Sequence, residues 1–411
     1  MTAKSDAPLS GDSQVRWFLI GQACWFAAFG LQAVLFPYLI VNVLFESPDR
    51  VGLAQTCLLA PALALMVPGG MLADAVDLRT LLVRLQLLAV LPVSILAWSI
   101  GVSGGAFLTL IIFALVHGSL QAMVTPTRDA LLGRIAGLHV QRAITNALGV
   151  QFAAQIIGFG LASTASTFGV VPLLVVQGCL YALSAACAAQ MTKLPPIRRT
   201  VQAGESTNPS QLAELKAAFA QVWRSPTIGP VTGIMSGVGL FFISVFQVVV
   251  PVMVRDHYQG GSAELALVNA AFVVGVLSAT TVMSRIAPVK AQGMAIFLSA
   301  CGGAMLCMVF AAQPSALWFY TCVWVFGAGA GVLMSLSRTV VQQSASDVFR
   351  ARILAIYSLA FLGSAPIGAL LVGQLAEWVG VLQAAFMAGL GMVGLLAVLA
   401  LWGGILRVRA V

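Results

Sequence analysis

The chain has 411 residues, of which 60% are hydrophobic and 8% are charged, and its net charge is +8. A soluble protein has about a quarter of its residues charged. This composition therefore excludes a soluble globular protein and indicates that lipid surrounds most of the chain.

The first fifteen residues are polar and are not followed by the short apolar core and small-residue cleavage site of a signal peptide. We therefore expect residues 1–15 to form a cytoplasmic N-terminal tail, with no cleaved signal sequence.

Twelve apolar stretches follow, each long enough for a helix that crosses a bilayer, which takes about 20 residues. They are residues 16–43, 51–73, 80–101, 104–127, 143–167, 169–191, 227–254, 263–284, 290–312, 315–337, 352–377 and 379–405. All seven cysteines lie within these stretches, which indicates buried thiols and no extracellular disulfide framework.

The positive charges predict how these spans are oriented. With the N-terminus in the cytoplasm, 19 of the 21 Lys and Arg residues fall on the cytoplasmic side, and only Arg50 and Arg255 fall outside. Cytoplasmic loops carry such an excess. The sequence thus predicts a multi-pass protein of the cytoplasmic (inner) membrane with both termini inside, and the basic charge needs no nucleic-acid partner.

One long polar connection divides the spans into two sets of six. Residues 192–226 form a predicted cytoplasmic linker, and apolar residues recur at helical spacing from Leu212 to Trp223, which predicts a short amphipathic helix on the membrane surface. The predicted domains are a six-helix bundle over 16–191, a second over 227–405, and a cytoplasmic tail over 406–411.

The two halves repeat each other at a shift of about 210 residues. Arg128 corresponds to Arg338, Arg142 to Arg352, and Gly158 to Gly368. Two six-helix halves related in this way are typical of a transporter.

The loop after the second span points to a family. Residues 69–79, GGMLADAVDLR, resemble the G-x-x-x-D-x-x-G-R-[RK] pattern between helices 2 and 3 of the major facilitator superfamily: Gly70, Asp74 and Arg79 match, whereas Asp77 and Leu78 differ. Residues 342–380 resemble the branch that contains the enterobactin exporter and related secretion-type facilitators. The resemblance implies an all-α membrane protein with twelve transmembrane helices in two pseudo-symmetric bundles, working as a monomer.

The resemblance also implies a cytoplasmic gate. In this family, Asp74 would face the Arg352 end of helix 11 and Arg79 would approach Asp129, so that the contacts hold the cytoplasmic side closed. The charged residues that we assign to this gate are Asp74, Asp77, Arg79, Arg128, Asp129, Arg142, Arg338 and Arg352. The alternative is that Arg79, Arg84, Arg128 and Arg142 only set the topology and extend to the interface.

His117 is the one ionisable residue, cysteines aside, near the middle of a predicted span. It shares a helix face with Gln121, Val124 and Arg128. A histidine has a reference pKa of about 6.5, which suits proton exchange, so His117 is our candidate for proton coupling. The alternative is a neutral histidine hydrogen-bonded to a neighbouring helix.

Amide and aromatic side chains within the spans are candidates for lining a substrate cavity. Together they suit a ligand of mixed polarity. They are Gln22, Trp25, Phe29, Gln32, Gln121, Gln151, Gln155, Gln247 and Trp324.

We interpret the protein as a secondary active transporter that exports a small organic or amphipathic molecule, such as a siderophore, drug or metabolite, by alternating access against protons. The run GFGLAS at residues 158–163 keeps little of the G-P-x-x-G-G exporter pattern, which leaves open an importer, a facilitator or a lipid flippase without proton antiport. A non-transporting receptor or scaffold is a further alternative.

Other function classes find little support. The three histidines are scattered, and the predicted spans contain no cluster of acids, so we expect no enzyme, metal site or cofactor. No nucleotide-binding loop of the Gly-rich type is present to couple ATP directly.

Overall fold

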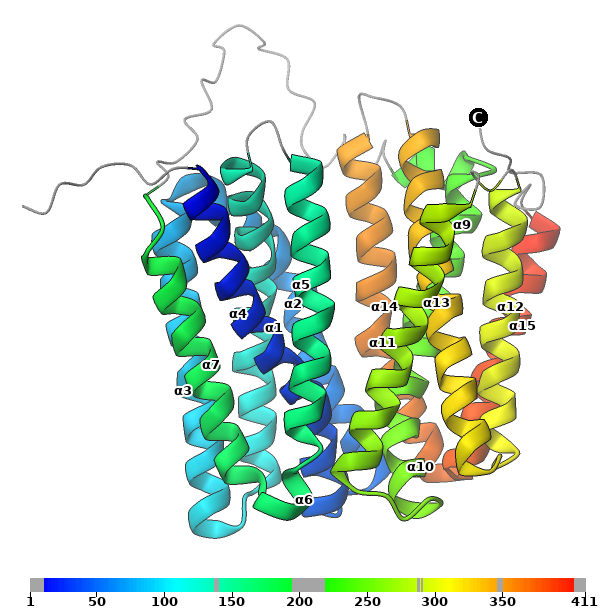
Figure 1. Ribbon diagram of the computed structural model, residues 1–411. Coiled ribbons are helices and arrows are strands. Elements are labelled where there is room, and N and C mark those ends of the chain that lie inside the picture. Colours follow the sequence, from blue (N-terminus) through cyan, green and yellow to red (C-terminus); the bar gives the residue numbers. More distant parts are fainter. Residues whose placement is uncertain are drawn as a thin grey trace, which may run out of the picture. The chain divides into compact units, whose positions relative to one another are not determined.

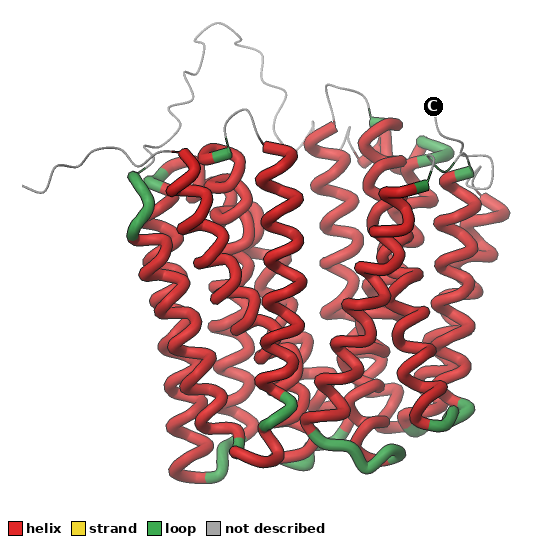
Figure 2. The backbone as a smooth tube through the Cα atoms, in the orientation of Figure 1, coloured by secondary structure: helices red, strands yellow, loops and turns green. Residues whose placement is uncertain are grey.

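The computed structural model describes residues 11–136, 140–193, 219–286, 289, 291–345 and 350–402. These residues are almost entirely helical and contain no strand (Figures 1 and 2). Eleven helices in this part of the chain are long and apolar enough to cross a membrane. The helix α2, Pro48–Ala75, occupies the further predicted span 51–73. The predicted all-α fold is therefore confirmed, and the helix count agrees with twelve spans.

The helices pack into two compact units, one comprising residues 1–39 and 60–199 and the other residues 40–59 and 200–411. The helices of the first unit are α1 (Gly11–Tyr38), α3 (Leu78–Ser103), α4 (Phe107–Ile135), α5 (Val140–Ala162), the short α6 (Ala165–Phe168) and α7 (Val170–Ala189), with the second half of α2. Those of the second unit are α9 (Ile228–Gly237), α10 (Val250–Asp256), α11 (Ser262–Arg285), α12 (Gln292–Ala311), α13 (Ala316–Ser344), α14 (Arg350–Val379) and α15 (Val381–Trp402).

Segments of π-helix interrupt two of the spans. The segment η1 (Leu39–Val43) follows Pro37 at the end of α1, and η3 (Val238–Ile243) and η4 (Val245–Val249) lie between α9 and Pro251. Proline cannot donate a backbone hydrogen bond, so the helical ladder must adjust around it. The two prolines close the corresponding first spans of the two halves.

Glycines bring two helices of the first unit into backbone contact. A Cβ atom on Gly158 of α5 would lie 2.2 Å from the carbonyl oxygen of Ala27 in α1, and one on Gly30 of α1 would lie 2.4 Å from the carbonyl oxygen of Gln155. Close approach through small residues is a common way for membrane helices to associate without a hydrophobic driving force.

The second unit repeats this crossing. A Cβ atom on Gly368 of α14 would lie 2.0 Å from the carbonyl oxygen of Leu240 in η3, and one on Gly239 would lie 2.2 Å from the carbonyl oxygen of Phe361. The predicted pair Gly158 and Gly368 therefore has the same structural role in the two units, as expected for a repeat.

Residues 40–59 pack with the second unit, although they precede the predicted linker in the chain. Thr56 donates a hydrogen bond to the carbonyl oxygen of Pro366 at 2.9 Å, and Arg255 donates one to the carbonyl oxygen of Val41 at 2.9 Å. A Cβ on Gly52 would lie 2.4 Å from the carbonyl oxygen of Ala369. The predicted N-terminal bundle over residues 16–191 stays a prediction.

The connections between the predicted domains are only partly described. The predicted tails over 1–10 and 403–411 lie outside the described residues, as does most of the linker, 194–218. Residues 219–224 are helical. In this turn Val222 is buried, whereas Phe219 and Trp223 are 48% and 70% exposed.

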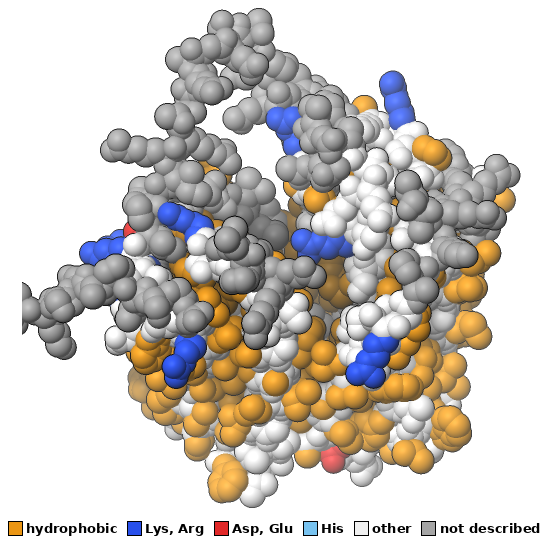
Figure 3. Space-filling model, turned by 45° about the horizontal axis from the view of Figure 1, so that its top comes forward, with side chains coloured by type: hydrophobic (Ala, Val, Ile, Leu, Met, Phe, Trp, Pro, Cys, Tyr) orange, Lys and Arg blue, Asp and Glu red, His pale blue; other side chains and the backbone are white. Residues whose placement is uncertain are grey.

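The described surface has the character expected for contact with lipid. In Figure 3 apolar side chains cover most of the lower part of the described surface, whereas Lys and Arg side chains lie in its upper and middle parts. Among the exposed apolar residues are Leu91, Trp98 and Leu108, each more than half exposed. Large apolar side chains in water would be unfavourable in such numbers, so the flanks are the lipid-facing surface.

Candidate functional site

A cluster of polar side chains lies in the core of the first unit. His117 of α4, Gln32 of α1, and Gln177 and Tyr181 of α7 come together there, and each is at most 4% exposed. The hydroxyl of Tyr181 donates to Oε1 of Gln32 at 3.2 Å, and Nε2 of Gln177 donates to the same oxygen at 3.2 Å. Buried polar groups need such partners, so the cluster ties three helices together.

His117 completes this network from α4. Its Nε2 lies 3.3 Å from the Tyr181 hydroxyl oxygen, and its ring stacks on Phe113 with centroids 5.2 Å apart. Since the Tyr181 proton is directed to Gln32, Nε2–H of a neutral His117 donates to the Tyr181 oxygen. Nδ1 is buried and has no partner among the described residues. A second proton, on Nδ1, would lack an acceptor. Of the two predicted roles of His117, this arrangement therefore fits the neutral histidine that is hydrogen-bonded to a neighbouring helix.

Two of the predicted cavity residues on α1 are also enclosed. Gln22 donates its amide N–H to the carbonyl oxygen of Ala147 in α5 at 2.7 Å. Trp25 is 2% exposed and packs against Tyr181, with ring centroids 4.8 Å apart. The structure thus brings Trp25 and Gln32 together with His117, and it engages all three, with Gln22, in contacts within the protein.

Other predicted cavity residues are more accessible. In the first unit Phe29, Gln121 and Gln151 are partly exposed, whereas Gln155 is buried. In the second unit Gln247 is partly exposed, and its carbonyl oxygen accepts a hydrogen bond from Gln55 at 3.4 Å. Trp324 of α13 is 41% exposed. Their assignment to a substrate cavity stays a prediction.

The predicted gate residues have different surroundings. Asp77 caps the N-terminus of α3: its carboxylate accepts a hydrogen bond from the backbone N–H of Thr80 at 2.9 Å and one from the Thr80 hydroxyl at 2.5 Å. Nη2 of Arg79 donates to the carbonyl oxygen of Ala189. The loop therefore holds the start of α3 against the end of α7 within the first unit, and the contact of Arg79 with Asp129 stays a prediction.

The remaining gate residues are described in part. The side chains of Asp74 and Arg142 lie outside the described ones, Asp129 and Arg338 are exposed, and Arg352 is partly buried. Arg128 differs from these because it is only 7% exposed, and its guanidinium lies over the ring of Phe26, 4.3 Å from the centroid. Arg128 therefore packs within the first unit, and its role in the gate stays a prediction.

Three further buried polar residues were not predicted from the sequence: Gln177, Tyr181 and Gln86. Gln177 and Tyr181 are four residues apart and so share a face of α7, and an amide and a phenol within an otherwise apolar span are a signal for a polar contact. Gln86 of α3 is 2% exposed, and its Oε1 has no partner among the described residues.

The lipid-facing flanks, the enclosed polar groups and the repeated helix crossing define a multi-pass helical membrane protein built as a duplicated bundle. Residues 18–346 match the family model of the Major Facilitator Superfamily. The chain therefore belongs to the Major Facilitator Superfamily, and it is a membrane transporter rather than an enzyme.

Comparison with individual proteins supports this assignment. The chain is 24% identical over 392 residues to the enterobactin exporter EntS of Shigella dysenteriae serotype 1 (strain Sd197), covering 90% of this chain and 88% of that protein. It is 25% identical over 192 residues to EntS of Escherichia coli O1:K1 / APEC, covering 46% of this chain and 45% of that protein.

Solved structures show the same fold at lower identity. The nucleoside transporter NupG superposes with a TM-score of 0.72 at 12% identity, over 94% of this chain and 98% of that chain. A POT family transporter in complex with 5-aminolevulinic acid gives a TM-score of 0.72 at 11% identity, over 95% of this chain and 96% of that chain.

Proposed function

We propose that the protein is a secondary active transporter that exports a small organic molecule across the cytoplasmic membrane by alternating access. The observation that carries this proposal is the similarity to an enterobactin exporter, which extends over 90% of the chain and so includes both halves. Family membership supports transport, and this relative supports the outward direction.

The substrate that we propose is a molecule of mixed polarity with no obligatory charge. Phe29, Gln121 and Gln151 in the first unit, and Gln247 and Trp324 in the second, offer aromatic and amide groups that are at least partly exposed. Such groups recognise apolar surface together with hydrogen-bonding atoms. Siderophores, drugs and secreted metabolites all fall within this class.

Proton antiport through His117 belongs to this proposal as one form of energy coupling. For His117 to take up a proton, Nδ1 must gain an acceptor that the described residues do not offer in this arrangement, so the core of the first unit would have to rearrange during the cycle. Such coupling of protonation to helix movement is what an antiporter requires.

A second form, transport without proton antiport, is favoured by the enclosure of His117. The residue is 0% exposed, and Tyr181 engages its Nε2. A facilitator, importer or flippase would use this cluster only to hold α1, α4 and α7 together.

Proton antiport and transport without protons predict different effects of His117→Ala on pH-driven transport. If His117 is the proton site, transport driven by a pH gradient is abolished in this variant, whereas the unchanged chain responds to the gradient. Transport that keeps its pH dependence in His117→Ala would exclude His117 as the proton site. His257→Ala, which removes an exposed histidine of the second unit, serves as the control.

The direction and the substrate are tested by comparing small molecules inside and outside cells with and without the gene. Export predicts a compound that accumulates in the deletion strain and returns to the medium when the intact gene is restored. A compound depleted inside the deletion strain would indicate import and contradict the proposal.

A further inference from the structure

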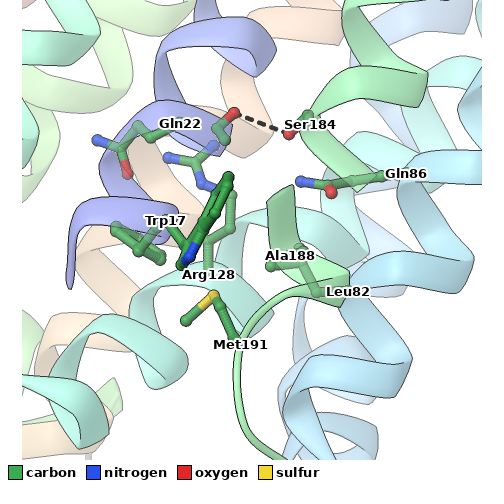
Figure 4. Close-up of a pocket in the computed structure, with 10 residues that line it drawn as sticks. Trp17, Gln22, Leu82, Gln86, Arg128, Ser184, Ala188 and Met191 are labelled. Atoms are coloured by element: carbon green, nitrogen blue, oxygen red, sulfur yellow. Dashed lines mark hydrogen bonds between the residues drawn. The ribbon is translucent and has the colours of Figure 1, made fainter. Parts of the chain in front are cut away.

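A narrow pocket lies inside the first unit, near the start of α1 (Figure 4). Its walls come from α1, α3, α4, α7 and Met191, the residue two positions past α7, so it is formed by one unit alone. Its volume is about 10 Å³, which is room for about one water molecule. The pocket can therefore hold a ligand of one heavy atom and nothing larger.

Two polar atoms of the lining side chains have no hydrogen-bond partner among the described residues. They are Nε of Arg128 on α4 and Oε1 of Gln86 on α3, and both atoms are buried. The two residues are 7% and 2% exposed. A buried polar atom that makes no hydrogen bond is unfavourable, so we expect each of these atoms to bind a partner in the pocket that both side chains line.

The two atoms have complementary roles in hydrogen bonding. The Nε–H of an arginine can only donate, whereas the amide oxygen of a glutamine can only accept. Neither atom is the partner of the other, so a ligand that joins them must accept from Arg128 and donate to Gln86. A halide ion cannot donate a hydrogen bond, and a metal cation cannot accept one.

The charge of Arg128 does not require an ion in the pocket either. The carboxylate of Asp129, the next residue in the chain, interacts electrostatically with the guanidinium. On another side, Cζ of Arg128 lies 4.3 Å from the centroid of the Phe26 ring, and an aromatic face attracts a cation. A neutral ligand therefore suits the pocket.

Ser184 of α7 offers a third contact in the same pocket. It is 0% exposed and donates its hydroxyl proton to the carbonyl oxygen of Gly21 at 2.8 Å, so its Oγ can still accept a hydrogen bond. Figure 4 shows Ser184, Gln86 and Arg128 around the pocket. One donor and two acceptors match the needs of a buried water molecule, which typically makes about three hydrogen bonds.

We propose that this pocket binds one water molecule, which accepts a hydrogen bond from Nε–H of Arg128 and donates to Oε1 of Gln86 and to Oγ of Ser184. The water links α4 to α3 and α7 and fixes the position of the Arg128 side chain. This site goes beyond the proposed transport function, because it concerns how the first unit is held together.

The first test is a structure of the unchanged full-length protein at a resolution that shows ordered waters. We expect one solvent peak within about 3.2 Å of both Nε of Arg128 and Oε1 of Gln86. The proposal is overturned by a direct hydrogen bond between these two side chains, by an ion in the pocket, or by the absence of a peak there while other buried waters are visible.

The second test detects the water in solution by nuclear magnetic resonance of the protein in detergent, with isotope-labelled arginine. The Nε–H signal of Arg128 is assigned by its absence in Arg128→Lys. We expect a nuclear Overhauser cross-peak between this proton and water, with the sign of a water molecule that tumbles with the protein. A missing cross-peak in the unchanged chain would contradict the proposal.

A matched pair of variants tests the role of Gln86. Gln86→Met removes the acceptor and keeps a side chain of similar length, so we expect the cross-peak of Arg128 to lose most of its intensity. Gln55→Met, which changes a buried glutamine of the second unit, should leave the cross-peak unchanged. Equal intensity in Gln86→Met and in the unchanged chain would show that Gln86 does not hold the water. None of these readouts requires transport, so they are independent of the proposed function.

Discussion

Tyr181 is the residue on which the polar core of the first unit converges. Its hydroxyl lies within hydrogen-bond distance of His117, Gln32 and Gln177, and its ring packs against Trp25. The hydroxyl is thus shared among three helices in the buried core of the unit. In such a setting an unmet hydrogen bond costs more than the bond itself contributes.

Removing this hydroxyl should weaken the unit. We expect Tyr181→Phe to lower the free energy of unfolding by about 1–2 kcal/mol, because it leaves Nε2 of His117 and an N–H of Gln177 unsatisfied. The measurement is thermal unfolding in detergent. Tyr357→Phe is the control, since the Tyr357 hydroxyl makes a hydrogen bond with the Ser337 hydroxyl at 2.7 Å. An equal loss in the two variants would contradict the central role of Tyr181.

Asp77 illustrates a local role for a predicted gate residue. We expect Asp77→Ala to lower the free energy of unfolding by about 0.5–2 kcal/mol, the usual cost of losing an N-cap. Asp77→Asn should keep most of the stability, because an asparagine side chain also accepts from the N–H of Thr80. Unfolding midpoints and transport rates measured together separate the roles: loss of transport in a stable Asp77→Asn protein would show that the charge acts in gating.

Sequence reasoning at this scale found His117 and Gln32 but not their partners. Polar residues inside an apolar span can be recognised by type, whereas the contacts between them depend on helix rotation and packing, which one sequence does not reveal. For this reason the sequence does not decide whether Gln22 and Trp25 line a cavity or pack in the core. It also does not distinguish a buried Arg128 from an Arg128 that lies at the membrane interface.

At the scale of the helices, the reciprocal glycine crossings organise each unit. Gly30 and Gly158 allow α1 and α5 to touch through their backbones, and Gly239 and Gly368 do the same for η3 and α14. The repeat was predictable for Gly158 and Gly368 from their spacing. The π-helical segments beside Pro37 and Pro251 were not predictable from the sequence. A proline predicts that the helical hydrogen-bond pattern is disturbed, but it does not predict which conformation results.

A large side chain at the crossing should force the helices apart. We expect Gly158→Leu to reduce stability by at least about 1–3 kcal/mol, the usual cost of overpacking, since even a Cβ would lie 2.2 Å from the carbonyl oxygen of Ala27. Gly160→Leu, two residues away, is the control because its Cβ would meet nothing within 4 Å. The yield of monodisperse protein and its unfolding midpoint are the readouts. Tolerance of Gly158→Leu would contradict the tight crossing.

At the scale of the whole molecule, the twelve spans and the duplication could be predicted because hydropathy and helix length depend on composition. The boundaries of the packing units could not. Residues 40–59 group with the second unit through Gly52, Thr56 and Arg255. These contacts join residues about 210 to 320 positions apart, which no local sequence pattern reports.

The orientation of the chain in the membrane remains a prediction from its charges, and α12 offers a compact test of it. This helix has 20 residues, so at about 1.5 Å per residue it spans roughly 30 Å, the thickness of the hydrocarbon core. Arg285 and Lys290 lie near its first end, whereas the turn at its other end, residues 312–315, carries no Lys or Arg. The positive-inside rule therefore places the first end in the cytoplasm.

Single cysteines at the two ends, in a chain whose seven native cysteines are replaced, make this measurable. Ile286 is 52% exposed, and Ser315 is exposed and makes no capping hydrogen bond with its side chain. We expect a membrane-impermeant maleimide to label Ser315→Cys in intact cells and to label Ile286→Cys only after permeabilisation. The reverse pattern would invert the topology, and with it the side on which the gate residues act. Labelling of both in intact cells would show that α12 does not cross the bilayer, because its two ends would then share one side.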